Sequence, residues 1–125
     1  FDSVIVTLGS NVDFKDKIYQ ELKSANLKFT NAIHPSAIIA YGINLGQGNV
    51  VAANVVIGAF TFLGENNIFS SSCVIEHHNI VGISNSFGPN VGLTRTMFMN
   101  TQVYSPGIRP LHTPLANAFR ASNIK

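Results

Sequence analysis

The sequence predicts a mainly β fold, a parallel β-helix built from hexapeptide repeats. Its strongest support is a spacing rule, because every sixth residue from 33 to 99 is bulky and apolar, without an insertion. An α-helix has a period of 3.6 residues and a strand a period of 2, so neither gives this pattern. Hexapeptide repeats of a β-helix do. The composition agrees, because ten glycines and only 11% charged residues suit short strands with tight corners. The series is Ile33, Ile39, Leu45, Val51, Ile57, Leu63, Phe69, Ile75, Val81, Phe87, Leu93 and Met99.

The first thirty residues follow a different pattern, that of a βαβ unit. Residues 4–8 form a continuous apolar and β-branched run, as in a strand that is covered on both faces. After a turn, Asp13 is the expected helix N-cap, and residues 27–29 form a second strand. The apolar face of the intervening helix, over 14–25, is Phe14, Ile18, Leu22 and Ala25. This unit predicts a partial Rossmann-like segment. It cannot cover its own strands, so we expect either a longer α/β domain or a small cap on the solenoid.

Three hexads make one triangular coil, so the repeat predicts about four coils in which each residue stacks on the one 18 further along. Asn49, Asn67 and Asn85 then form a polar ladder along the axis. Val55, Cys73 and Val91 form a column of small side chains, with Cys73 buried, and Phe69 stacks on Phe87 inside. Glycine follows the bulky residue at five positions, where we expect a corner conformation that other residues resist. These are Gly46, Gly58, Gly64, Gly82 and Gly88.

These patterns divide the chain into three parts: 1–31, 32–104 and a proline-rich cap or tail over 105–125. The net charge of +2 is small, and no basic face is clustered, which argues against nucleic acid as a partner. There is no apolar run of about 18 residues to predict membrane insertion. The single cysteine excludes an internal disulfide and fits a reducing compartment, so we expect a cytoplasmic protein.

Reactive side chains are densest at Glu76, His77 and His78. The 18-residue spacing places His77 in a column with Tyr41, Ala59 and Arg95. A cation beside an imidazole favours the neutral form, which suits a general base. Adjacent residues of a strand face opposite ways, so His77 and His78 are expected to point apart. The alternative interpretation is two surface histidines without a catalytic role.

Two segments resemble a known family, residues 32–37 (Ala-Ile-His-Pro-Ser-Ala) and residues 72–77 (Ser-Cys-Val-Ile-Glu-His). With the hexads between them, they are similar to the left-handed β-helix acyltransferases that modify amino sugars. The most similar group comprises sialic-acid O-acetyltransferases and bacillosamine-type nucleotide-sugar N-acetyltransferases, and the resemblance covers about residues 1–92. It implies a left-handed helix, a homotrimer with acetyl-CoA between neighbouring subunits, and a Rossmann-like subdomain for the nucleotide sugar. The implied function is acetyl transfer to an amino or hydroxyl group in bacterial surface glycan biosynthesis.

The same resemblance implies roles for individual residues. His77 is the general base, with Glu76 beside it in the acid–histidine element. Candidates for binding acetyl-CoA are Ser86, Arg95 and Asn85, and Arg109 is a further candidate for its phosphates. Candidates for binding the sugar nucleotide are Gly9, Asn11 and His78. The sequence departs from the family twice: His78 stands where an acidic residue orients the base, and Ser86 stands near the place of a second histidine.

Two other functions remain open. A trimeric β-helix with a degraded site would serve as a scaffold, which the two departures favour and the presence of His77 opposes. A zinc enzyme of the γ-carbonic-anhydrase type needs three histidines, which His77, His78 and His112 would have to supply. His112 lies outside the repeat, and so the preferred prediction includes no metal.

Overall fold

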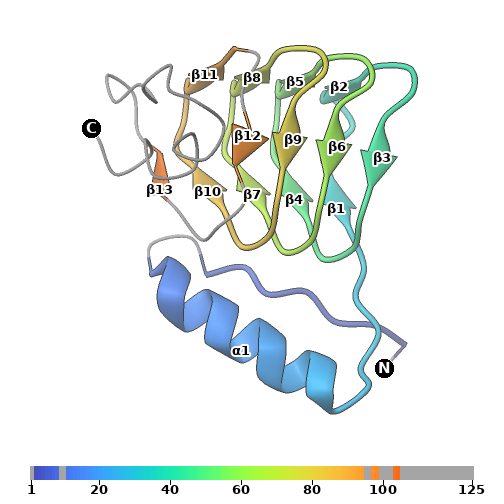
Figure 1. Ribbon diagram of the computed structural model, residues 1–125, viewed down its shortest axis with the longest axis vertical. Helices are drawn as coiled ribbons and strands as arrows, with labels where there is room; N and C mark the ends of the chain where they lie inside the picture. Colours follow the sequence, from blue (N-terminus) through green and yellow to red (C-terminus); the bar gives the residue numbers. More distant parts are fainter. Residues whose placement is uncertain (1, 9–10, 95–96, 99–102, 105–125) are drawn as a thin grey trace.

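The computed structural model describes residues 2–8, 11–94, 97–98 and 103–104. These residues contain one helix and a parallel β-solenoid of two-residue strands, as Figure 1 shows. The elements are α1 (Val12–Ser24), β1 (Ala32–Ile33), β2 (Ile38–Ile39), β3 (Asn44–Leu45), β4 (Val50–Val51), β5 (Val56–Ile57), β6 (Phe62–Leu63), β7 (Ile68–Phe69), β8 (Val74–Ile75), β9 (Ile80–Val81), β10 (Ser86–Phe87), β11 (Gly92–Leu93), β12 (Met97–Phe98) and β13 (Val103–Tyr104). They form three sheets, ordered β1-β4-β7-β10-β13, β11-β8-β5-β2 and β12-β9-β6-β3.

The strand register confirms the predicted coil. Val51 pairs with Phe69, and Ile57 pairs with Ile75, so each strand lies beside the strand 18 residues further along. Successive strands along the chain belong to the three sheets in turn, which makes each coil triangular. The mainly β solenoid is therefore as predicted from the hexads. The left-handed turn of the coil, which came from the family resemblance, stays a prediction.

The register shortens by one residue after β11. Val81 pairs with Phe98, and Phe87 pairs with Tyr104, which are separations of 17 residues. The prediction that the series continues without interruption to Met99 is therefore wrong at its last position, because Phe98 takes the place beside Val81. Hydrophobic spacing could not reveal this change, since residues 97–99 are Met, Phe and Met, which are all bulky and apolar.

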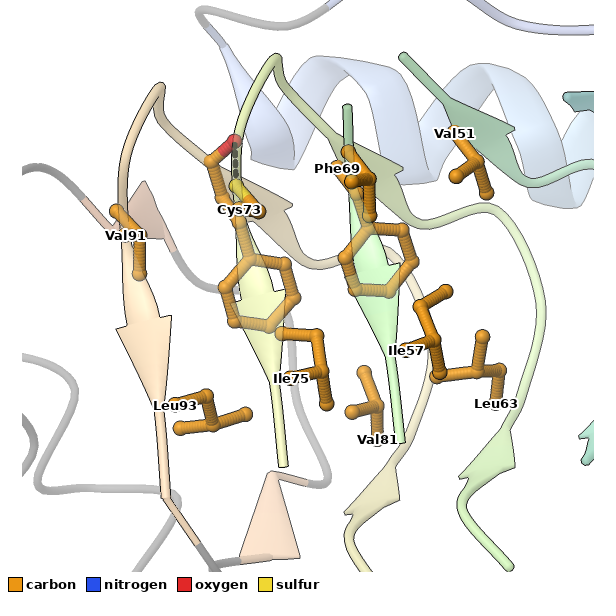
Figure 2. Packing of buried hydrophobic residues seen from close by; sticks show 11 residues of the cluster. Val51, Ile57, Leu63, Phe69, Cys73, Ile75, Val81, Val91 and Leu93 are labelled. Atoms are coloured by element: carbon orange, nitrogen blue, oxygen red, sulfur yellow. Dashed lines mark hydrogen bonds between the residues drawn. The ribbon is translucent and has the colours of Figure 1, made fainter. Parts of the chain in front are cut away.

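The core is a single stack of apolar side chains inside the coils (Figure 2). Phe69 and Phe87 stack with their ring centroids 5.0 Å apart and their planes 7° from parallel. Cys73 is fully buried between Val55 and Val91, and its thiol donates to the carbonyl oxygen of Gly88 at 3.0 Å. Burial raises the pKa of this thiol to about 11. The predicted packing role of Cys73 is thus confirmed, and its high pKa does not suit a nucleophile.

The asparagine ladder is also confirmed. The side-chain oxygen of Asn49 accepts from both the backbone N–H (2.9 Å) and the side-chain amide (3.1 Å) of Asn67. Asn67 receives the same two bonds from Asn85, at 2.9 and 3.0 Å. The ladder begins one coil earlier than predicted, because the side-chain oxygen of Asn31 accepts from the backbone N–H of Asn49 at 2.7 Å. It fixes one corner along the length of the solenoid.

The corners require a left-handed backbone, but at other positions than predicted. A positive φ recurs every six residues from 42 to 90 within the described coils. These residues are Gly42, Gly48, Asn54, Phe60, Asn66, Ser72, His78, Ser84 and Asn90. None of the five glycines that follow the bulky residues is among them, so the conformational explanation was wrong. Glycine is required at positions 46 and 64 for a steric reason instead, because a Cβ there would overlap with a carbonyl of the next coil.

The N-terminal segment forms the helix, and in its described residues a single parallel bridge, Val4 to Phe29, stands in place of two full strands. The helix N-cap is Asn11, whose side chain accepts from the backbone N–H of Phe14 at 3.0 Å, and not Asp13. This satisfies one of the free N–H groups of the first turn. Among the described residues, a Rossmann-like sheet does not extend beyond this bridge.

The predicted apolar face of the helix is only partly buried. Ile18 and Leu22 are half-buried against the small cluster of Val6, Tyr19 and Phe29, but Phe14 and Ala25 are exposed. Lys15 and Tyr19 are fully buried instead. They face the solenoid, and a pattern of apolar residues alone does not identify a face that makes polar contacts.

Helix α1 lies along the lower side of the coils in Figure 1 and is joined to one corner of them by polar contacts. The ammonium of Lys15 donates to the carbonyl of Asn66, and Tyr19 donates to the carboxylate of Glu65 at 2.9 Å. Lys23 pairs with the same carboxylate at 2.6 Å. The described helix is neither long nor apolar enough to cross a membrane.

Candidate active site

Residues 76–79 form the corner between β8 and β9, and hydrogen bonds within it and to the neighbouring coils hold its backbone. The carbonyl of Glu76 accepts from the side-chain amide of Asn79 at 2.7 Å and from the hydroxyl of Thr61 at 3.1 Å. The backbone N–H of His78 donates to the carbonyl of Ala59 on the preceding coil at 2.9 Å. Gly58 has no room for a side chain here, because a Cβ would lie 2.5 Å from the backbone nitrogen of His77. The corner is therefore a fixed platform.

His77 and His78 lie together on this platform, both exposed to solvent. Their Nδ1 atoms are 2.8 Å apart, which is hydrogen-bond distance, and their rings meet edge to face. The prediction that they point apart is wrong. It treated both residues as part of a strand, but β8 ends at Ile75, and His78 has a left-handed backbone with φ of 57°. That conformation turns the second side chain towards the first.

An aromatic column supports His78 from the preceding coils. Its ring lies 5.3 Å from the ring of Phe60, which occupies the equivalent position one coil earlier. Phe60 in turn meets Tyr41 edge to face, with centroids 5.9 Å apart. The hydrogen bonds of Thr61 and Asn79 were not predicted from the sequence. The 18-residue spacing contained the signal for Phe60, because residues 60 and 78 share one column.

The histidine pair can provide one imidazole as a base and the other as the neighbour that fixes the tautomer of that base. Two neutral imidazoles that share a hydrogen bond must divide the roles of donor and acceptor, and this leaves the Nε2 atom of the donor ring unprotonated. In the described part of the chain, the carboxylate of Glu76 makes no hydrogen bond to either imidazole ring. The hydrogen bonds of Glu76 are made by its backbone carbonyl and N–H. Glu76 therefore contributes to the corner through its carbonyl.

The other candidate residues are spread over the molecule. Asn85 is buried in the ladder, and Ser86 is buried on β10. Asn11 uses its side-chain oxygen to cap α1. Gly9 and Arg95 lie outside the described residues, as do Arg109 and His112. Their predicted contacts with acetyl-CoA, sugar nucleotide or metal remain predictions.

Two outer faces of the solenoid beside the site are apolar and exposed. Ile38 and Val74 lie on one sheet, and Phe62 and Ile80 lie on the next, with the histidine corner between them. Tyr41, at the same corner two coils earlier, is 82% exposed. Within the described residues, no three His, Cys, Asp or Glu side chains gather closely enough to hold a metal ion.

Solved structures provide the comparison. With 26% sequence identity and a TM-score of 0.70, the chain is similar to PerB from Caulobacter crescentus in complex with CoA and GDP-perosamine. A variant of the GDP-perosamine N-acetyltransferase of that organism, with a histidine replaced by alanine, matches at 25% identity and the same TM-score. The fold is that of nucleotide-sugar acetyltransferases. The family resemblance predicted from the sequence is thereby confirmed at the level of structure.

A further acetyltransferase shares the fold. The acetyltransferase domain of PglB from Neisseria gonorrhoeae matches with 18% identity and a TM-score of 0.61, over 90% of this chain and 68% of that domain. It has also been solved in complex with acetyl coenzyme A. No family model and no curated protein matches the chain. The match to PerB covers 86% of this chain and 55% of PerB, so this chain spans about half of that acetyltransferase.

Proposed function

We propose that this protein transfers an acetyl group from acetyl-CoA to an amino group, or else a hydroxyl group, of a nucleotide-linked sugar. The observation that carries the proposal is the paired, exposed imidazole of His77 on a fixed corner of a solenoid whose fold matches PerB. PerB and the related transferase are complexes with CoA and GDP-perosamine, and the latter is an N-acetyltransferase. An amino sugar is therefore the favoured acceptor class, and the reaction belongs to the cytoplasm, where we expect the protein.

The proposed step needs one base. The sugar amine attacks the carbonyl carbon of the thioester while His77 Nε2 takes a proton from the nitrogen. The C–N bond forms, the C–S bond breaks, and the proton then passes from His77 to the departing thiolate, which gives CoASH and an amide. General-base assistance of this kind contributes about 10²- to 10⁴-fold. Positioning of the two substrates supplies a large further share of the acceleration.

The exposed position of the histidine pair supports a site that a second subunit completes. His77 lies on an open corner, and apolar side chains flank it on two sheets, with Ile38 60% exposed. A homotrimer that covers these faces would place acetyl-CoA in the groove between neighbouring solenoids. In this proposal Ser86, Arg95 and Asn85 lie towards the coenzyme. Residues 1–31 then belong to the sugar-nucleotide part, with Gly9 and Asn11 towards the sugar. Residues 32–104 form the acyltransferase domain, and residues 105–125 form a cap.

The test is thiol release from acetyl-CoA in the presence of GDP-perosamine and a panel of UDP-amino sugars. We expect release to depend on the sugar and to fall at least ~10²-fold in His77→Ala. His34→Ala is the matched control, because His34 is also an exposed histidine whose Nδ1 makes a hydrogen bond, to the hydroxyl of Ser36 at 2.8 Å. It should keep full activity. Equal loss in both variants would contradict the role of His77.

The alternative function is a non-catalytic trimeric scaffold. The observation in its favour is the absence of an acidic side chain at position 78, where His78 stands. A scaffold would assemble as a trimer, release no thiol with any sugar, and be indifferent to His77→Ala.

A further inference from the structure

We propose that His78 is the positioning residue for the general base: its Nδ1 accepts the Nδ1 proton of His77 and so keeps the His77 Nε2 atom free to take a proton. This inference rests on the proposed function and deepens it. The juxtaposition that carries it is the 2.8 Å separation of the two Nδ1 atoms. A second imidazole would then do what a carboxylate does in an acid–histidine pair.

The geometry restricts which proton arrangement is productive. At 2.8 Å, one proton lies between the two Nδ1 atoms, and it belongs to either ring. If His78 is the donor, His77 carries its own proton on Nε2 and cannot act as a base. If His77 is the donor, its Nε2 is unprotonated and exposed. Only the second arrangement supports acetyl transfer.

The pair also stabilises the charge that forms during the reaction. When His77 takes the proton from the sugar amine, it becomes an imidazolium with N–H groups at both nitrogens. Its Nδ1–H then donates to a neutral imidazole, and a hydrogen bond with a charged donor is shorter and stronger than one between neutral groups. The bond is therefore stronger after proton transfer than before, which is the condition for assisting the step.

His78 is fixed independently of His77. Its backbone is left-handed, with φ of 57°, and its N–H donates to Ala59 on the preceding coil. Its ring packs against Phe60 at 5.3 Å. A residue whose backbone is fixed and whose ring packs against a neighbouring ring loses little freedom when it accepts a hydrogen bond, so it can orient the donor. A surface histidine without these contacts would not.

The charges around the pair are few. Residues 58–61 of the preceding coil contain no ionisable side chain. Tyr41 contacts the ring of Phe60, which in turn contacts the ring of His78. Glu76 is in the same corner, and Arg95, which the spacing assigns to the next coil, lies outside the described residues. No charged group of residues 58–61 competes with His78 for the Nδ1 proton of His77.

Three substitutions at position 78 separate orientation from simple structure, because all three residues tolerate a left-handed backbone. His78→Asn places an amide oxygen where the Nδ1 atom was, and should keep kcat within about threefold. His78→Gly removes the acceptor, and should lower kcat by about 10- to 100-fold while the KM for acetyl-CoA and for the sugar stay unchanged. His78→Asp supplies a charged acceptor for the same Nδ1 proton, and should also keep kcat.

The readout that does not depend on turnover is the ¹⁵N NMR spectrum of the imidazoles in the full chain. In the parent protein and in His78→Asn, we expect His77 to be protonated at Nδ1 and not at Nε2; in His78→Gly this preference should disappear. An unchanged tautomer and an unchanged kcat in His78→Gly would overturn the inference, as would a rise in KM in place of the fall in kcat. If the parent releases no thiol with any sugar, the proposed function fails, and the tautomer alone still decides whether His78 orients His77.

Discussion

Gly64 lies so close to the carbonyl oxygen of Gly82 on the next coil that a Cβ at residue 64 would overlap with it. The same relationship joins Gly46 to Gly64. One column of the solenoid thus consists of glycines in backbone contact, because neighbouring coils approach more closely there than a side chain allows.

This contact predicts that Gly64→Ala destabilises the solenoid. The obstacle is backbone, which cannot move aside as a flexible side chain can, so we expect a loss of about 1–3 kcal/mol in the free energy of unfolding. Gly92→Ala is the matched control, since nothing lies within 4 Å of a Cβ at that position. Urea unfolding of both variants measures the difference. Equal stabilities of the two variants would contradict the close approach.

Asn67 should be the most sensitive position of the asparagine ladder. Its side-chain amide donates to Asn49 and to the carbonyl of Gly82, and its oxygen accepts two bonds from Asn85. Asn67→Leu keeps the volume and leaves several buried polar groups without partners, at about 1–3 kcal/mol each. We expect at least ~3 kcal/mol of destabilisation in thermal unfolding. Asn44→Leu, at an exposed position of β3, should cost much less; a similar cost would mean that the ladder adds nothing specific.

The sequence predicted most of the solenoid because a repeat needs only its period to be recognised. The 18-residue stacking, the pair of Phe69 and Phe87, and the asparagine ladder all follow from that number. It also placed His77 outside the buried columns, although on a strand and not at a corner. The change of the register from 18 to 17 residues after β11 could not be predicted in this way, because neighbouring apolar residues conceal a shift of one position.

The relation between His77 and His78 could not be predicted, since it depends on backbone torsion and not on composition. A strand model sends consecutive side chains to opposite faces, whereas the left-handed residue at the corner brings them together. The face of α1 was missed for a related reason. Lys15 counts as polar in any periodicity, yet it is buried because its ammonium donates a hydrogen bond to the carbonyl of Asn66 on the solenoid.

Phe60 should influence turnover through His78. Its ring packs against that imidazole, and an aromatic contact of this kind is worth about 0.5–1.5 kcal/mol, or roughly 2- to 10-fold in rate. Phe60→Asn removes the ring and tolerates the left-handed backbone, so we expect kcat to fall by about this factor. Phe14→Ala is the matched control, because Phe14 is also an exposed phenylalanine but lies on α1. It should leave kcat unchanged. A change in KM alone would point to a substrate contact instead.

The junction between α1 and the solenoid should depend on pH through Lys15. Burial lowers the pKa of its ammonium from 10.5 to about 8, and nearby Asp16 opposes this only in part. Between these two values the unfolded chain binds more protons than the native protein, so the free energy of unfolding rises with pH. The slope from this one group is at most about 1.4 kcal/mol per pH unit. Lys15→Met should remove the rise.

The measurement is the difference in unfolding free energy between the parent chain and Lys15→Met from pH 7.5 to 10.5. Two other groups act in the opposite direction, because burial raises the pKa of Cys73 to about 11 and also raises that of Tyr19. Both hold their protons longer in the native state, which lowers stability above pH 9 and 10 respectively. They are present in both proteins and cancel in the difference. A difference that stays flat across this range would mean that the native ammonium is not desolvated, and that α1 is held chiefly by Tyr19, Lys23 and Glu65.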